Sequence, residues 1–246
     1  MSDTHFTMQG KGGVGKTFTA SILAQFFAAG LQEGQSLKLI DTDPVNATFS
    51  QYKAFEVVRL ELQEGSNSQI TTRKFDQLLE MMLTDDQSTF VVDNGAASFL
   101  PLSHYMIENK AIEMMLDAGR TVWIHPVITG GLGQDDTLSG LDHLARQMPA
   151  AVKIVVWKNP YFGRIEKGGK PFEEMPVYKN HAKRLHAVIN IPDQSADTFG
   201  EDVKTMLQQK MTFDQAIGSD AFGIMSRQRL KITKEKLFSS IAPVFA

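Results

Sequence analysis

Short apolar runs recur along the chain, and each is followed by a stretch whose apolar residues have helical spacing. The runs that we interpret as strands cover residues 4–9, 36–41, 89–94, 121–128, 153–159 and 187–192. Several of them are almost continuously apolar, which is typical of strands covered on both faces. Alternation of such strands with helices predicts an α/β fold with a doubly wound, mostly parallel sheet and helices on both faces.

The helical stretches show amphipathic spacing. Within residues 73–83, an apolar stripe recurs at three- and four-residue intervals, which places it on one face of a helix. The residues of this stripe are Phe75, Leu78, Leu79 and Met82. We expect this face to pack on the sheet.

One region breaks the alternation of strands and helices. Residues 160–180 are rich in proline, glycine and charge, and they lie between two predicted strands. We interpret them as a surface insertion in a single domain that spans residues 1–246. Two readings stay open for the insertion, a partner-binding element and a plain connecting loop.

Composition narrows the classes of function. The chain of 246 residues has a formal net charge of −3, so any contact with nucleic acid must come from a local basic patch. It has no cysteine, which excludes disulfides, thiolate metal sites, iron–sulfur ligation and thiol nucleophiles. Its first residues show no basic or apolar signal region, and no run of about 18 apolar residues occurs. We therefore expect a cytoplasmic protein without a transmembrane helix.

The strongest motif lies between the first predicted strand and the helical stretch that follows it. Residues 8–17 read MQGKGGVGKT, in which Gly10, Gly15, Lys16 and Thr17 match the phosphate-binding pattern G-x-x-x-x-G-K-[ST]. Glycines let backbone N–H groups turn toward a phosphate, and the following helix N-terminus adds partial positive charge. The pattern assigns Lys16 to the β- and γ-phosphates and the Thr17 hydroxyl to Mg²⁺. A glycine-rich turn with chance lysines is the alternative, which the strand–loop–helix context disfavours.

A second lysine, Lys11, stands at the front of the same loop. One lysine suffices for the phosphates of its own subunit, so Lys11 would project away from them unless it folded back. The deviant pattern K-G-G-x-G-K-[ST], from Lys11 to Thr17, resembles the ParA/MinD family of P-loop ATPases, in which this lysine reaches the nucleotide of a second subunit. The resemblance implies a homodimer that forms on ATP binding, with catalytic roles for Lys11, Lys16 and Asp43. A solvated surface charge is the plain alternative for Lys11. The nucleotide contacts implied for this loop are Gly10, Lys11, Gly12, Gly13, Val14, Gly15, Lys16, Thr17 and Phe18.

The end of the second predicted strand carries two aspartates. Residues 39–48, LIDTDPVNAT, resemble the A′ motif of the same family. By this resemblance Asp43 orients the attacking water and Asp41 holds a Mg²⁺-bound water. The family usually has Gln-Gly between the proline and the asparagine, where this chain has only Val45, so the path of this loop stays open.

The third predicted strand also ends in a carboxylate. In residues 89–96, TFVVDNGA, Asp93 occupies the Walker B position, where a carboxylate supports the Mg²⁺ shell. The resemblance implies that the Gly95 N–H senses the γ-phosphate. A strand-end aspartate is common by itself, but its register with the other motifs gives a metal-binding set of Thr17, Asp41 and Asp93.

The segments expected beside the base favour ATP. A GTPase of this class would show [NT]-K-x-D, but the chain reads VVWKNPYFG after the fifth strand. Asn159 stands where ParA and MinD relatives keep an asparagine that contacts adenine. Residues 190–194, NIPDQ, resemble the family segment beside the base and imply contacts from Pro192 and Asp193, although a routine turn also explains Pro-Asp. We therefore expect ATP or ADP with Mg²⁺ as the cofactors.

The C-terminal segment is basic, and only Glu235 opposes its cations. These cations are Arg227, Arg229, Lys231, Lys234 and Lys236. Such a patch would give salt-sensitive DNA binding without sequence preference, and a solvated helix face is an equally good reading. The last residues have a short apolar face that Pro243 interrupts, so docking on the body is favoured over membrane insertion.

Taken together, the motifs are similar to the plasmid-transfer branch of the ParA/MinD family, with TraL- and StbB-like members. This resemblance implies a weak ATPase that dimerises with ATP and acts as a partner-regulated switch in plasmid conjugative transfer, stability or positioning. A metabolic P-loop ligase or kinase with a small-molecule acceptor stays open, as does an adaptor that holds ATP without hydrolysing it. Relatives of the nitrogenase iron protein and of the arsenite pump rely on cysteines, which this chain lacks.

Overall fold

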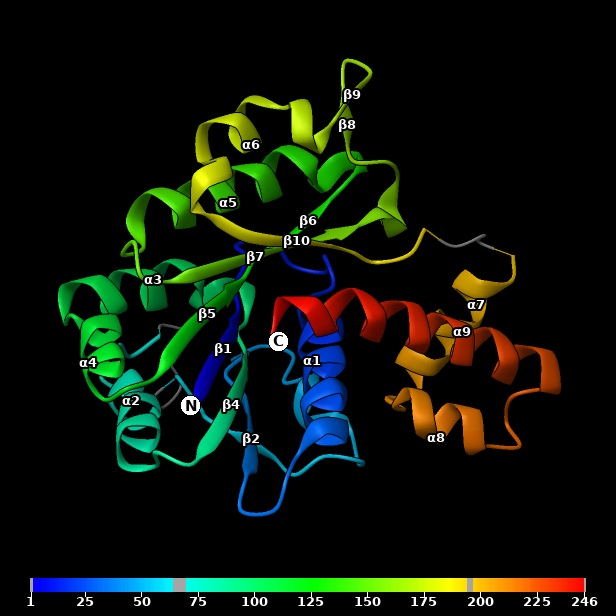
Figure 1. Ribbon diagram of the computed structural model, residues 1–246, viewed down its shortest axis with the longest axis horizontal. Helices are drawn as coiled ribbons and strands as arrows, with labels where there is room; N and C mark the ends of the chain where they lie inside the picture. Colours follow the sequence, from blue (N-terminus) through cyan, green and yellow to red (C-terminus); the bar gives the residue numbers. More distant parts are fainter. Residues whose placement is uncertain (1, 64–69, 194–196, 246) are drawn as a thin grey trace.

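The computed structural model describes residues 2–63, 70–193 and 197–245. Its centre is a sheet in which every adjacent pair of strands is parallel, in the order β10-β7-β5-β1-β4-β2-β3, with β6 also paired to β7 (Figure 1). The strands of this sheet are β1 (Asp3–Thr7), β2 (Ser36–Asp41), β3 (Val57–Arg59), β4 (Ser88–Asp93), β5 (Thr121–His125), β6 (Val127–Thr129), β7 (Lys153–Asn159) and β10 (Leu185–Asn190).

Helices cover both faces of the sheet. They are α1 (Lys16–Gly30), α2 (Lys74–Thr84), α3 (Phe99–Glu108), α4 (Ala111–Asp117), α5 (Gln134–Gln147), α6 (Pro176–His181), α7 (Phe199–Gln208), α8 (Phe213–Gly218) and α9 (Ile224–Ile241). In Figure 1, α9 lies beside α1, and α7 and α8 pack near its outer end. Helices α2 and α4 lie on the opposite side of the sheet. The predicted α/β fold with a doubly wound parallel sheet is confirmed.

Alternate residues of the strands point into two separate apolar cores, one on each face of the sheet. On β4, Phe90 and Val92 pack in the core formed with α2 to α5, and Val91 packs in the core formed with α1 and α9. On β7, Val156 and Trp157 divide in the same way. Because both faces are buried, these strands are almost continuously apolar in sequence.

The predicted apolar stripe of α2 faces the sheet. Each of its four members is at most 5% exposed, and all belong to the same core. The stripe consists of Phe75, Leu78, Leu79 and Met82. The helical interpretation of this segment is confirmed.

The structure differs from the predicted strands in two places. The run at residues 121–128 forms two strands, β5 and β6, because Pro126 between them has no N–H to donate to a neighbouring strand. Strand β3 is absent from the sequence-based prediction. It is a short edge strand with largely exposed residues, so it lacks the apolar run that marks a buried strand.

The insertion at residues 160–180 is more ordered than its composition suggests. It contains an antiparallel hairpin of β8 (Glu166–Lys167) and β9 (Lys170–Pro171), followed by α6. The hairpin itself is exposed, but Ile165 and Phe172 at its base are buried in the core beside α5. Strands of two residues leave no periodic signal in a sequence, which explains why neither reading of this insertion included a hairpin.

A buried histidine pair lies on the sheet face that packs against α1 and α9. The indole Nε1 of Trp157 donates to His125 Nδ1 (3.1 Å), and His125 Nε2 lies 3.0 Å from His5 Nδ1. Because an indole N–H can only donate, His125 must carry its proton on Nε2 and donate it to His5. Burial lowers the pKa of both imidazoles, that of His125 to about 3. Both histidines are therefore neutral parts of the core.

We expect the free energy of unfolding to fall as the pH drops from about 6.5 toward 4. In this range the unfolded chain takes up protons on His5 and His125 while the folded chain does not, so acid favours the unfolded state. The expected slope is about 1.4 kcal/mol per pH unit for each histidine. Urea titrations across this range measure it, and His5→Leu should reduce the slope by one histidine's share. An unchanged slope in that variant would contradict the assignment.

The C-terminal residues dock on the body of the protein. Phe245 packs edge-on against Trp123 and His5, with ring centroids 4.8 and 5.2 Å apart, and its ring also lies 5.3 Å from that of Phe27. This is the docked arrangement that the sequence favoured. Across the described ranges, every helix is too short or too polar to cross a membrane.

Candidate nucleotide site

The phosphate-binding loop of residues 8–15, called the P-loop below, connects β1 to α1 at the carboxyl edge of the sheet. Gly13 and Gly15 have φ values of 75° and 106°, which favour glycine. Gly15 is also constrained by space, because a Cβ there would lie 2.7 Å from Asn159 Nδ2. The two glycines thus shape the loop through backbone conformation, and Gly15 additionally through packing.

Lys16 is buried at the start of α1. It is 7% exposed, and its Nζ donates to the carbonyl of Lys11 at 3.0 Å. Burial lowers the pKa of this amine, whereas the nearby Asp93 and Asp43 raise it. A buried ammonium held next to backbone N–H groups is a favourable site for a phosphate.

Gln9 fixes the front of the loop, and sequence reasoning missed it. Its Oε1 accepts from the Gly10 N–H (2.9 Å), while its Nε2 donates to the carbonyls of Val127 and Thr137 (both 3.0 Å). A Cβ at Gly140 would lie 2.0 Å from the Gln9 amide oxygen, so α5 approaches this side chain closely. No sequence signal marked this role, because the predicted strand at residues 4–9 also contains the polar residues Thr4, His5 and Thr7.

Asp93 ends β4 and faces the loop. Its carboxylate accepts from the hydroxyls of Thr17 (2.6 Å) and Thr7 (2.9 Å), so the predicted partners Thr17 and Asp93 do meet. Burial raises the pKa of Asp93 to about 6, against the two hydroxyl hydrogen bonds, which lower it.

The aspartates of the A′ segment lie beside this pair. Asp41 ends β2, and its carboxylate accepts from the N–H groups of Asp43 (3.0 Å) and Ser50 (2.9 Å). Asp43 caps its own turn by accepting from the N–H groups of Val45 and Asn46 on Oδ1. Burial raises the pKa of Asp41.

Gly95 touches the A′ segment directly. A Cβ at Gly95 would lie 2.8 Å from the Asp43 backbone and carboxylate, so the ends of β2 and β4 are in close contact. The predicted sensor and the predicted water-positioning residue are therefore adjacent.

The donor set fits Mg²⁺ bound together with phosphate. Thr17, Asp41 and Asp93 offer hard oxygen ligands at one edge of the sheet, as this ion prefers. Over the described part of the chain, no group of three or more His, Cys, Asp or Glu side chains forms a metal cage. Mg²⁺ usually uses one or two carboxylates, waters and substrate phosphates, so a site completed by nucleotide matches these residues.

We expect Asp93→Asn to stabilise the nucleotide-free protein at pH 7.5 by about 1 to 3 kcal/mol. The folded pKa lies above the unfolded value, so the stability contributed by the protonated form is lost as the pH rises through about 6. The neutral amide removes this loss but also removes a carboxylate from the metal set. Thermal unfolding with and without Mg²⁺ and ATP measures both effects, with the exposed Asp117→Asn as control. Destabilisation of the nucleotide-free variant would contradict the prediction.

A cavity of about 630 Å³ opens beside the P-loop. Of the predicted contacts, Phe18, Asn159, Pro192 and Asp193 line it, together with Gly13 and Gly15. Gln194 of the same predicted segment lies outside the described residues. The structure thus brings the predicted base contacts to one cavity.

Asn159 also holds the P-loop. Its Nδ2 donates to the Val14 carbonyl (2.8 Å), and its Oδ1 accepts from the Tyr161 N–H (3.2 Å). Tyr161 and Phe162 line the same cavity, and residues of α7 close its other side. These lining residues carried no motif by which the sequence could reveal them.

Lys11 lies at the rim of the site. Its Nζ forms a 2.8 Å ion pair with Asp136 in the first turn of α5, and the two side chains are 45% and 59% exposed. The lysine thus makes its ion pair within its own chain while remaining open to solvent. No sequence motif indicated Asp136 as its partner.

The basic residues of α9 are largely paired. Arg227, Arg229 and Lys234 form ion pairs with nearby aspartates. For Lys231 and Lys236, no ion pair occurs within the described residues. These two lysines are the cations left for another partner.

Comparison with known proteins identifies the relatives of this chain. It is 46% identical over 241 residues to a Protein TraL of Escherichia coli, and 45% identical over 241 residues to a second Protein TraL of that organism, with 98% of each chain covered in both cases. Among solved structures, the MinC:MinD cell division protein complex of Aquifex aeolicus matches with a TM-score of 0.50 at 13% identity, covering 97% of this chain and 96% of that chain. No protein-family model matches.

The structural match shows a shared fold, and the sequence matches show a family. The structural match is a fold shared with MinD, and the sequence matches confirm the resemblance to TraL proteins. At this identity over almost the whole length, the chain belongs to the TraL family.

Proposed function

We propose that this chain is a Mg²⁺-dependent ATPase that dimerises when it binds ATP and acts as a partner-regulated switch in plasmid transfer, stability or positioning. Its TraL relatives and MinD-like fold support this role. The observation that carries the proposal is that two lysines of one loop differ in their burial and position. Lys16 is buried inside the site, whereas Lys11 stands half-exposed at its rim.

Within one subunit, the loop binds the triphosphate. Lys16 and the loop N–H groups take the β- and γ-phosphates, and Thr17, Asp41 and Asp93 would hold Mg²⁺. Bound Mg²⁺ would neutralise charge that develops on the phosphate oxygens. Asp43 orients the attacking water through Oδ2, which makes no hydrogen bond within the described residues, while Oδ1 stays in its turn.

Between two subunits, Lys11 supplies the missing charge. A triphosphate bound by one copy keeps negative charge at the open side of the site, and Lys11 of a second copy neutralises it. ATP favours the dimer because it contacts the dimer more than the monomer. Lys11 must first leave Asp136, an exposed partner that is easily exchanged.

The test is the size of the particle with different nucleotides. We expect a monomer with ADP and a dimer with Mg²⁺ and a non-hydrolysable ATP analogue, measured by light scattering after size exclusion. A monomer in both conditions would overturn the proposal. A product phosphorylated only in the presence of a small-molecule acceptor would instead favour a kinase or ligase.

DNA is the second partner that we propose, through α9 of the ATP-bound dimer. Most cations of this helix are paired, so binding should depend on Lys231 and Lys236 and should weaken steeply with salt. Addition of duplex DNA to the same sizing experiment checks this, with Lys231→Ala/Lys236→Ala as the matched variant. DNA binding that is equal in the variant and the parent would exclude this surface.

A further inference from the structure

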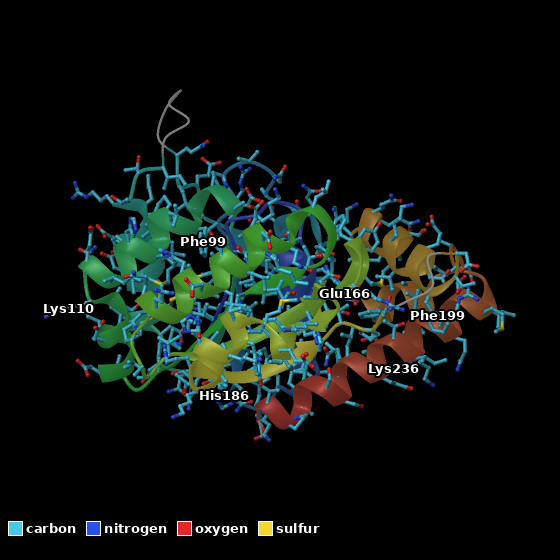
Figure 2. All side chains as sticks on the ribbon, turned by 90° about the horizontal axis from the view of Figure 1, so that it is seen from above. Phe99, Lys110, Glu166, His186, Phe199 and Lys236 are labelled. Atoms are coloured by element: carbon cyan, nitrogen blue, oxygen red, sulfur yellow. The ribbon has the colours of Figure 1, made fainter. Side chains whose placement is uncertain are left out.

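The β8–β9 hairpin is an exposed element on a fixed base. Gly168 and Gly169 form its turn with φ values of 58° and 74°, the combination that closes tight two-residue hairpins. Buried Ile165 and Phe172 anchor its two ends. In Figure 1 the hairpin projects from the body beyond α5, and Figure 2 shows its residue Glu166 in the middle of the upper surface. The tip is therefore displayed to solvent in a defined position.

The tip of the hairpin is cationic, because Lys167 and Lys170 flank its two-glycine turn. Around the tip, Arg164 is a further exposed cation, and Glu166, Glu173 and Glu174 are exposed carboxylates, of which Glu173 pairs with Lys158. Within the described ranges, Arg164 and Lys170 make no ion pair. Such a small cationic tip fits a short acidic segment of a protein, whose closely spaced carboxylates can reach both lysines.

The hairpin is fastened to the first turn of α5. Gln134 exchanges two hydrogen bonds with the backbone of Glu166 (3.0 and 3.2 Å), and Asp135 pairs with Lys167 at 2.7 Å. The loop before α5 is also close, because a Cβ at Gly130 would lie only 2.3 Å from a backbone oxygen of the insertion. The hairpin and this turn are therefore joined by side-chain and backbone contacts.

The next residue of the same turn holds Lys11. Gln134 and Asp135 contact the hairpin, and Asp136 pairs with Lys11 at 2.8 Å. Three consecutive residues thus connect an exposed hairpin to the lysine that the proposed function assigns to the second subunit. An acidic ligand that captures Lys167 takes it from Asp135 and loosens the turn that holds Lys11.

We propose that the β8–β9 hairpin is the docking surface for an acidic segment of a regulatory protein, and that docking there releases Lys11 from Asp136. Asp136 is then a positioning residue, which keeps Lys11 on its own subunit until a partner binds. The inference rests on the proposed function, because the released lysine acts across the dimer.

The experiment measures how fast Lys11 reacts with an amine-specific reagent in the nucleotide-free protein, by peptide mass spectrometry. The probe is an N-acetylated hexaglutamate peptide at low salt, with hexaglutamine as the neutral control. Release of an exposed ion pair should speed the labelling by about two- to five-fold. We expect this increase with hexaglutamate in the parent protein. In Asp136→Asn, Lys11 should react at this faster rate without any peptide, and hexaglutamate should not increase the rate further.

Variants of the hairpin locate the surface. In Lys167→Ala/Lys170→Ala, Lys11 should react faster than in the parent and should not respond to hexaglutamate. Lys179→Ala on α6, which removes an exposed lysine of the same insertion, should behave like the parent. The inference would be overturned if hexaglutamate left the labelling rate of Lys11 unchanged in the parent. It would also be overturned if only short duplex DNA increased that rate.

The two proposals fail separately. Unchanged Lys11 labelling overturns the hairpin inference, since no nucleotide is present in that experiment. Absence of a dimer with the ATP analogue overturns the proposed function instead, whatever the labelling shows.

Discussion

Lys11→Ala is expected to abolish ATP-dependent dimerisation while leaving ATP binding to the monomer within about twofold of the parent. A charge-assisted hydrogen bond contributes about 1.5 to 3 kcal/mol, and a symmetric dimer loses two of them. The dimer should therefore weaken by about 100-fold or more, and turnover should be lost with it. Light scattering with the ATP analogue and titration with a fluorescent nucleotide measure the two quantities.

The control is an exposed lysine away from the site. Lys153 begins β7 at the opposite edge of the sheet, and Lys153→Ala should dimerise like the parent. The ion pair lost in Lys11→Ala is exposed, so the fold should be unaffected. If Lys11→Ala dimerised with ATP as the parent does, the cross-subunit role of Lys11 would be wrong.

Asp43→Ala should give a long-lived ATP dimer that hydrolyses slowly. A positioned general base or water-orienting group contributes about 100- to 10,000-fold to a rate, so turnover should fall by about 100-fold or more. Binding should survive, because Lys16, Thr17 and Asp93 are untouched. Phosphate release and the lifetime of the dimer after dilution measure the effect.

Asp43→Asn separates chemistry from local folding. The amide oxygen can still accept from the Val45 and Asn46 N–H groups, so the turn is retained. It cannot carry the negative charge that orients the water. Equal loss of turnover in both variants supports the catalytic role, whereas normal hydrolysis in Asp43→Asn would assign Asp43 to the turn alone.

The phosphate loop and the carboxylates could be predicted because their requirements are local. Gly15 must have a positive φ and no side chain, and Lys16 must follow it into the helix, so the motif is visible in sequence. Asp41 and Asp93 end parallel neighbouring strands, which brings them to one edge of the sheet. The buried strands could be predicted because their continuous apolar runs are also a local feature of the sequence.

The remaining features depend on contacts between distant segments. Asp136 becomes a partner of Lys11 only when α5 packs beside the loop, and Gln9 gains its role from the same approach. Asn159 was predicted to contact the base, yet its hydrogen bond to Val14 is a property of the tertiary structure. The edge strand β3 and the hairpin are too short to have a period.

The most direct test is the structure of the Asp43→Ala protein with Mg²⁺ and ATP, since this variant should hold the dimer before hydrolysis. In that structure we expect Lys11 Nζ to lie about 2.7 to 2.9 Å from a phosphate oxygen of the nucleotide bound to a second copy. Lys11 still paired with Asp136 of its own chain in every ATP-bound assembly would contradict this expectation.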